Sequence, residues 1–389
     1  MKELKNRFGL SEWSGAMGDL GTTLPLAFAL IYINGFPVER IFLLWGLAYV
    51  VSGWFYRVPV SIQPLKAMAV IAIAAGYSTE FLSSTALYYG ILFILLSATG
   101  VIRWMAKWFS EALVRGIQLG IGLILAQKAF QLTYNNGLYL TREASAPLVN
   151  ILLLIAVILL LWYAQYKKGK PLILLLLLGA GILTIISGVS LKTATYHGAA
   201  AAFTPPQLSL ILNSLIFLMI PQLPLTLGNA VFAASDTCYL FWKERSKRVN
   251  PTRLGFSIGA GNVIIGLLGG FPICHGAGGI AGHAQFGGKT GGTTIIIGSI
   301  FVAAAFIKPL SSFLLYIPIL GGLLAFESWR LMSLIKRVPG KAELFISVLV
   351  GLLSFTTGNL TIAILTGFVI ERAYLLYIKK YAIMESEEK

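Results

Sequence analysis

Residues 59–75 read PVSIQPLKAMAVIAIAA, and residues 272–285 read PICHGAGGIAGHAQ. Each stretch opens with proline followed by polar or small residues and continues as a short, mostly apolar run. In a membrane protein, irregular polar backbone is tolerated at membrane depth only where it is buried in protein or lines a cavity. If the chain spans a membrane, the two stretches therefore predict two half-helices that begin near the membrane centre.

Composition indicates that lipid is the solvent of this chain. Of its 389 residues, 57% are hydrophobic and 12% are charged, whereas about a quarter of a soluble domain is charged. The formal charge of +15 is distributed in short clusters between apolar runs, which is typical of loops at a membrane surface. We therefore expect a bilayer as partner and no nucleic acid.

Fourteen apolar segments are predicted, most of them close to the 17–25 residues that cross a bilayer as a helix. They run approximately 13–34, 41–56, 59–75, 84–102, 111–133, 147–165, 171–190, 207–235, 254–270, 273–287, 291–307, 309–326, 342–358 and 359–378. Residues 1–10 show no cleavable signal peptide. Most basic residues, including the cluster Lys243–Arg248, fall on the side of the N-terminus, which predicts a cell-membrane protein with both termini cytoplasmic.

Two pairs of motifs recur with similar separation. GDLGTTLP at 18–25 is followed by PVSIQP at 59–64, and PQLPLTLG at 221–228 is followed by PICHG at 272–276. Each motif of the first half lies seven segments before its counterpart in the second half. Because seven is an odd number, the two halves have opposite orientations in the membrane. The predicted fold is an all-α polytopic membrane protein with about 14 transmembrane segments in a seven-plus-seven inverted repeat.

The two half-helices also predict the ligand. A helix N-terminus carries about half a positive charge and several unpaired N–H donors, so two that converge form an anion site suited to a tetrahedral oxyanion. Neither the two cysteines nor the three histidines have metal-ligand spacing, and we expect no cofactor and no metal. The candidate substrate-binding residues are Thr22, Thr23, Ser61, Gln63, Lys66, Gln222, Thr226, Asn229, His275, Gly276, Ala277 and Gly278.

Several of these residues have a second interpretation. Lys66 is a cation within the membrane and either faces the anion or pairs with Asp19, which has a structural or coupling role. His275 is a core histidine, a substrate donor or a proton-coupling group. Thr22 and Thr23 are alternatively explained by bonds to a helix carbonyl, as threonines often form in membrane helices. The glycines after His275 are alternatively explained by close helix packing.

Four motifs in order carry a family resemblance: GDLGT at 18–22, QPLK at 63–66, QLPLT at 222–226 and CHGAGG at 274–279. Together they resemble the molybdate transporter family, which is related to sulfate permeases and nucleobase transporters. The resemblance implies a core domain of residues 1–110 and 207–308, and a gate domain of residues 111–206 and 309–389. It also implies elevator-like movement between these domains and a homodimer through the gate domains.

The expected function is therefore secondary-active transport of an oxyanion, with molybdate favoured and sulfate or tungstate as alternatives. The chain ends soon after its last segment, without the cytoplasmic domain appended to many sulfate permeases, which favours the molybdate branch. A nucleobase is less favoured, since its ring N–H groups need carboxylates and no acid occurs at 221–235 or 271–290. An anion channel is a further alternative. A membrane-embedded enzyme is disfavoured because no nucleophile with its base and no metal cluster is evident.

Overall fold

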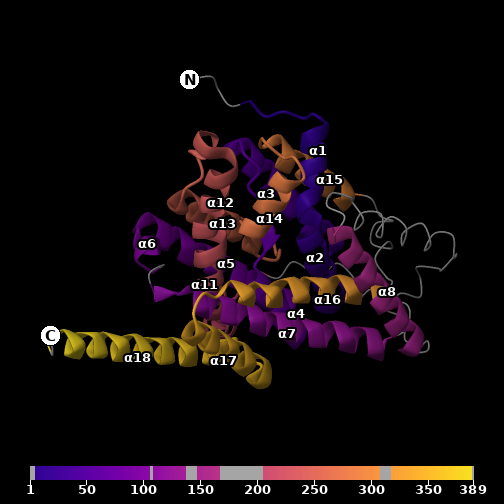
Figure 1. Ribbon diagram of the computed structural model, residues 1–389. Coiled ribbons are helices and arrows are strands. Elements are labelled where there is room, and N and C mark those ends of the chain that lie inside the picture. Colours follow the sequence, from indigo (N-terminus) through magenta and orange to yellow (C-terminus); the bar gives the residue numbers. More distant parts are fainter. Residues whose placement is uncertain (1–4, 106–107, 137–146, 167–204, 307–316, 388–389) are drawn as a thin grey trace.

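The computed structural model describes residues 5–105, 108–136, 147–166, 205–306 and 317–387, which are largely helical (Figure 1). The predicted segment 171–190 and the start of segment 309–326 lie outside these residues. Seven helices of the described part are long and apolar enough to cross a membrane, and shorter apolar helices lie at Lys66–Ala75, Pro147–Tyr163 and Gly292–Ala305. The prediction of an all-α, polytopic membrane protein is confirmed.

The first half of the chain contains a broken first span and a short fourth helix. A 3₁₀ turn at Met17–Asp19 interrupts the first span beside Gly18. The described elements are α1 (Leu10–Ala16), η1 (Met17–Asp19), α2 (Leu20–Asn34), α3 (Val38–Tyr56), β1 (Gln63–Pro64), α4 (Lys66–Ala75), α5 (Thr79–Ala98), α6 (Val101–Met105), α7 (Glu111–Asn135) and α8 (Pro147–Tyr166).

The second half begins with a span whose helix is locally widened into π-turns around Pro221 and Pro224, which lack the N–H of a regular α-helix. Its elements are η3 (Leu208–Leu210), α10 (Ile211–Ser214), η4 (Leu215–Met219), α11 (Ile220–Leu225), η5 (Thr226–Phe232), α12 (Ala233–Trp242), η6 (Lys243–Ser246), α13 (Pro251–Leu267), β2 (Ile273–Cys274), α14 (Ala277–Gln285), α15 (Gly292–Ala305), α16 (Ile317–Ser333), η8 (Leu334–Arg337), α17 (Lys341–Thr357) and α18 (Leu360–Glu387).

The two predicted half-helices are present, and their extended entry segments pair with each other. Strands β1 and β2 are antiparallel, with Gln63 opposite Cys274 and Pro64 opposite Ile273. The N–H of Leu65 adds a bond of 3.1 Å to the carbonyl of Pro272. Because the strands are antiparallel, α4 and α14 leave the crossing in opposite directions, as an inverted repeat requires.

Helix packing follows the same symmetry. Helix α3 packs on α15, and its repeat counterpart α13 packs on α5. Glycines allow both approaches: a Cβ on Gly46 would meet the backbone of Gly298, and one on Gly90 would meet the backbone of Gly259. Helices α7, α8, α16 and α17 form a second group, in which α7 packs on α16 and α17, and α8 packs on α16 (Figure 1).

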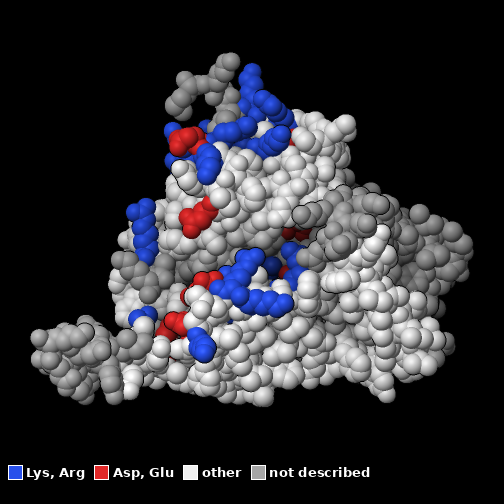
Figure 2. Space-filling model, viewed as in Figure 1, with Lys and Arg blue, Asp and Glu red and all other residues white. Residues whose placement is uncertain are grey.

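The N-terminal residues and the basic cluster Lys243–Arg248 lie at the same end of the molecule. Asn6 donates from Nδ2 to the carbonyl of Gly53 over 3.3 Å, and Arg248 donates from Nη1 to the carbonyl of Phe55 over 3.0 Å. Both contacts are at the C-terminal end of α3. Basic side chains gather at this end, at the top of Figure 2.

Candidate functional site

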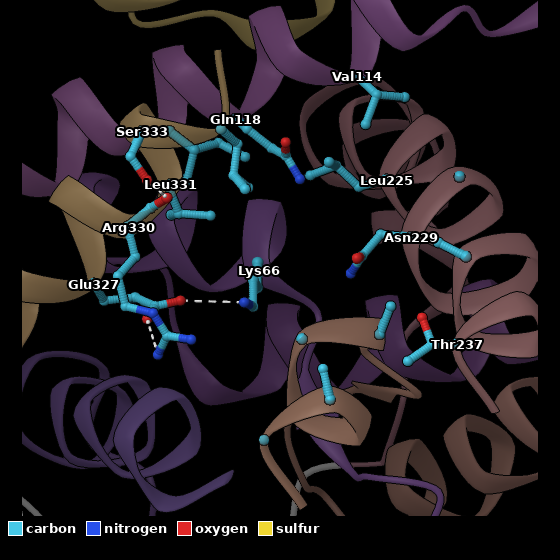
Figure 3. Close-up of a pocket in the computed structure, with 18 of the residues that line it drawn as sticks. Lys66, Val114, Gln118, Leu225, Asn229, Thr237, Glu327, Arg330, Leu331 and Ser333 are labelled. Atoms are coloured by element: carbon cyan, nitrogen blue, oxygen red, sulfur yellow. Dashed lines mark hydrogen bonds and ion pairs between the residues drawn. The ribbon is translucent and has the colours of Figure 1, made fainter. Parts of the chain in front are cut away.

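A pocket of about 1250 Å³ lies where the half-helices meet α7 and α16 (Figure 3). Lys66 reaches it from α4, Ala277 and Gly278 from the start of α14, Gln118 from α7, and Glu327 from α16. The site thus lies between the two groups of helices, and each group supplies part of its wall.

The N-terminus of α14 opens onto this pocket. The N–H groups of Gly279 and Ile280 both bond to the carbonyl of Gly276, at 3.1 and 3.2 Å. The first N–H groups of a helix have no partner within the helix, so those of Ala277 and Gly278 are left over at the pocket wall. A Cβ added to Gly278 would meet no atom within 4 Å. Bare backbone with unpaired donors therefore faces the cavity, as an anion site at a helix N-terminus requires.

The N-terminus of α4 is arranged differently. Gln222 accepts at Oε1 from the N–H groups of Ala67 and Met68, at 2.8 and 3.2 Å. Its Nε2 donates to Oγ1 of Thr226 over 3.0 Å, and the hydroxyl of Tyr89 donates to the same oxygen over 2.7 Å. Gln222 lines the pocket and caps the N-terminus of α4. It therefore accepts from N–H groups that the sequence analysis expected to bind the ligand. Two backbone donors of α4 are thus taken by the protein.

Lys66 forms an ion pair across the site. Its Nζ lies 3.1 Å from Oε1 of Glu327, and the two side chains are 18% and 2% exposed. Arg330, one turn along α16, lies 3.5 Å from Oε2 of Glu327 and donates from Nη1 to Oγ1 of Thr22 over 3.0 Å. Figure 3 shows Lys66 and Arg330 on either side of Glu327. The suggested pairing of Lys66 with Asp19 is wrong, because the carboxylate beside the ammonium is Glu327.

Asp19 belongs to a separate buried cluster behind the pocket. The hydroxyl of Tyr49 donates to Oδ2 over 2.6 Å, and the amide of Gln63 donates to Oδ1. Nε2 of His283 lies 3.9 Å from Oδ2. A Cβ on Gly279 would collide with the carboxylate. Asp19 thus joins the first span to β1 and α14, as its structural interpretation expects.

His275 is held within the protein on both ring nitrogens. Nε2 lies 2.5 Å from Oγ of Ser257, and Nδ1 lies 3.0 Å from the carbonyl of Ser61. A carbonyl only accepts, so Nδ1 carries the proton and Nε2 accepts from the serine hydroxyl. Ser61 in turn donates from Oγ to the carbonyl of Gly276 over 2.8 Å. These contacts match the core-histidine interpretation.

The structure therefore divides the predicted site residues into two sets. Those that line the pocket are Lys66, Gln222, Asn229, Ala277 and Gly278. Those that are not in its described lining are Asp19, Thr22, Thr23, Ser61, Gln63, Thr226, His275 and Gly276. Most of the second set support the half-helices, and Thr22 contacts the pocket indirectly through Arg330.

Sequence reasoning missed Glu327 and Arg330. The segment 309–326 was ended before these charges, whereas α16 continues to Ser333 and places both on the pocket wall. The sequence signal that could have revealed them is the i,i+3 spacing of Glu327 and Arg330 directly after an apolar segment, which allows an ion pair on one face of a continuing helix. Glu111 and Arg115 form an ion pair of 2.7 Å along α7, and both also line the pocket.

Charge in the pocket is predominantly positive. Among the described lining residues, the cations are Lys66, Arg115, Arg330 and Arg337, and the acids are Glu111 and Glu327. Figure 2 shows basic and acidic side chains together in a hollow in the middle of the visible face. A surplus of cations in a concave site favours entry of an anion.

Comparisons with known proteins agree with this geometry. A family model described as "Molybdate transporter of MFS superfamily" matches residues 11–125 and 214–331, more than half of the chain. Molybdate transporter 2 of Arabidopsis thaliana is 25% identical over 96% of this chain and 88% of its own. Guanine/hypoxanthine permease GhxP of Escherichia coli O157:H7 is 26% identical over 75% of this chain and 72% of its own.

Solved structures show the same fold. SLC26A9 aligns with a TM-score of 0.68 and 14% identity, over 95% of this chain and 65% of the SLC26A9 chain. This chain therefore spans about 65% of that protein's length. The transmembrane domain of a cyanobacterium bicarbonate transporter, BicA, aligns with a TM-score of 0.64 and 16% identity, over 93% of this chain and all of that chain. The seven-plus-seven inverted repeat is confirmed by these likenesses.

Proposed function

Because the chain belongs to the molybdate transporter family of membrane transport proteins, we propose that it is a secondary-active transporter that carries molybdate across the cell membrane. The observation that carries the substrate class is that Lys66 and the first two residues of α14, Ala277 and Gly278, line the same pocket. Backbone donors at a helix N-terminus and a cation in one pocket suit a tetrahedral dianion, whose oxygens accept hydrogen bonds in several directions.

The division into two moving parts is the second element of the proposal. Residues 1–110 and 207–308 form the core domain, which carries α4 and α14. Residues 111–206 and 309–389 form the gate domain, which carries α7 and α16 and through which two copies associate. The helix pairs within each group and the position of the pocket between the groups support an elevator in which the core carries the anion past the gate.

Orientation follows from the basic residues. With the Lys243–Arg248 cluster on the cytoplasmic side, the start of α7 and the end of α16 also lie on that side, since these segments alternate in direction along the chain. Glu111 and Arg337 line the pocket at those ends. We therefore assign the pocket mouth to the cytoplasmic side and the structure to an inward-open state.

Sulfate and tungstate are the nearest alternative substrates, because they share the charge and shape of molybdate. A nucleobase is the alternative favoured by the likeness to the guanine/hypoxanthine permease. The pocket does contain the carboxylate of Glu327 that a ring N–H would need, but two cations flank this carboxylate. This arrangement favours an anion over a neutral ring.

Purified protein in proteoliposomes tests the proposal. We expect an inwardly directed ion gradient to drive accumulation of labelled molybdate above its external concentration, with tungstate and sulfate as competitors and guanine without effect. Flux that only equalises the two concentrations would indicate a channel. Guanine uptake without molybdate uptake would establish the nucleobase alternative.

A further inference from the structure

Glu327 is an anion that the protein itself places in the anion pocket. Among the described residues of the lining, it is one of two acids, and the two differ in position. Glu111 is 52% exposed and pairs with Arg115 along its own helix. Glu327 is 2% exposed and bonds across the pocket to Lys66. Of the two acids, only Glu327 pairs with Lys66, the cation that the proposed function assigns to the substrate.

The charged groups around Glu327 come from its own helix and from the elements packed against it. Lys66 on α4 and Arg330 on its own helix are the cations within 4 Å. Farther along the wall lie Glu111 and Arg115 on α7, and Arg337 on η8. Oε2 of Glu327 has no hydrogen-bond partner in the described part of the chain.

A bound dianion changes that balance. Its oxygens would take over Lys66 and Arg330, and two negative charges would then lie beside a nearly buried carboxylate. Like charges at this range disfavour ionisation, and a buried carboxylate without its cation is costly. A proton from the solvent of the open pocket removes the conflict, because the neutral acid neither repels the anion nor competes for the lysine.

Building on the proposed function, we propose that Glu327 releases Lys66 and takes up one proton when the oxyanion binds, so that Glu327 is the proton-coupling site of transport. The exchange balances in charge and atoms: the carboxylate gains a proton from solvent, and the dianion replaces it at Lys66. Asp19 is not in the described pocket lining, and Tyr49 and Gln63 donate hydrogen bonds to it in the buried cluster.

The linkage fixes the direction of the pH effect. Protons are bound with the anion, so affinity for molybdate rises as pH falls, by at most about tenfold per pH unit for one proton. With Glu327→Gln the competing charge is absent. Affinity at neutral pH should then be about tenfold higher than in the natural protein and nearly independent of pH.

Isothermal titration calorimetry of molybdate into the purified protein tests this, in two buffers of different ionisation enthalpy and at several pH values at which molybdate is fully deprotonated. The natural protein should take up about one proton per anion, the limit set by a single carboxylate. Glu327→Gln should take up far less, and Glu244→Gln, which removes an exposed acid outside the pocket lining, should behave as the natural protein does.

The outcomes separate the two proposals. Absence of oxyanion binding by the natural protein would contradict the proposed function itself. Binding without proton uptake, or equal uptake in Glu327→Gln, would leave the function intact and overturn the assignment of Glu327. Since proton uptake is measured on the natural protein, binding without uptake would overturn the inference even if a variant fails to fold.

Discussion

Nζ of Lys66 lies 3.1 Å from Oε1 of Glu327 in the pocket, although 261 positions separate the two residues in the chain. One residue begins a half-helix, and the other lies on a helix of the proposed gate domain. Breaking a fully buried pair by removing one partner costs about 3–5 kcal/mol, and less here because Lys66 is partly exposed. The pair therefore makes the stability of the protein sensitive to which single charge is removed.

A double-mutant cycle measures this dependence. Lys66→Ala leaves the buried carboxylate of Glu327 unpaired and should lower the free energy of unfolding. Adding Glu327→Gln removes the unpaired charge and should recover most of the loss, whereas adding Asp19→Asn should not. Thermal unfolding in detergent reads out all variants. Recovery with Asp19→Asn but not with Glu327→Gln would mean that Lys66 pairs with Asp19 in the membrane.

The half-helices could be predicted from sequence because their signals are local. Proline and polar residues precede each short apolar run, and the resulting pairing of Gln63 with Cys274 needs only those two stretches. The partner of Lys66 could not be predicted in this way, because Glu327 lies 261 positions away in the sequence. Charges at Glu327 and Arg330 ended the predicted span at 326, whereas in the structure Lys66 and Thr22 give these charges partners and α16 continues.

The candidate polar residues show a related limit. Gln222 and His275 have the chemistry of ligand donors, and sequence alone cannot tell whether a nearer protein group uses them first. Two N–H groups of α4 take the oxygen of Gln222, and Ser257 with the carbonyl of Ser61 takes the ring of His275. Gly278 lines the pocket, and its role in substrate binding stays a prediction.

Two neighbouring glycines should respond in opposite ways to substitution. In Gly278→Leu the side chain enters open space, so the protein should fold and lose molybdate binding. In Gly279→Ala the methyl group meets the carboxylate of Asp19, so folding itself should suffer. Binding by calorimetry, together with thermal unfolding, distinguishes the two losses. Normal molybdate affinity in a folded Gly278→Leu variant would remove the α14 N-terminus from the site.

The cap on α4 predicts a further contrast. Gln222→Leu leaves the N–H groups of Ala67 and Met68 without their acceptor, which should cost about 1–3 kcal/mol of unfolding free energy. Gln222→Glu keeps an acceptor at the positive end of the helix and should preserve stability, but its charge should weaken anion binding. Equal stability of Gln222→Leu and the natural protein would show that the cap is unimportant.

The shared end of the N-terminal segment and the Lys243–Arg248 cluster predicts topology. A cysteine at Lys247, whose side chain is 68% exposed, should react with an impermeant maleimide from the cytoplasmic side only. A cysteine at Phe306, which is 74% exposed at the other end of α15, should show the reverse pattern. The natural cysteines Cys238 and Cys274 are buried and serve as the background. Labelling of position 247 from outside would invert the assigned orientation.

The location of bound molybdenum tests the central claim most directly. Crystals of the protein grown with molybdate can be measured at the molybdenum absorption edge, where the metal gives an anomalous signal of its own. We predict a peak in the pocket between Nζ of Lys66 and the N–H groups of Ala277 and Gly278. A peak elsewhere in the molecule, with this pocket free of anomalous signal while calorimetry shows saturation, would contradict the account.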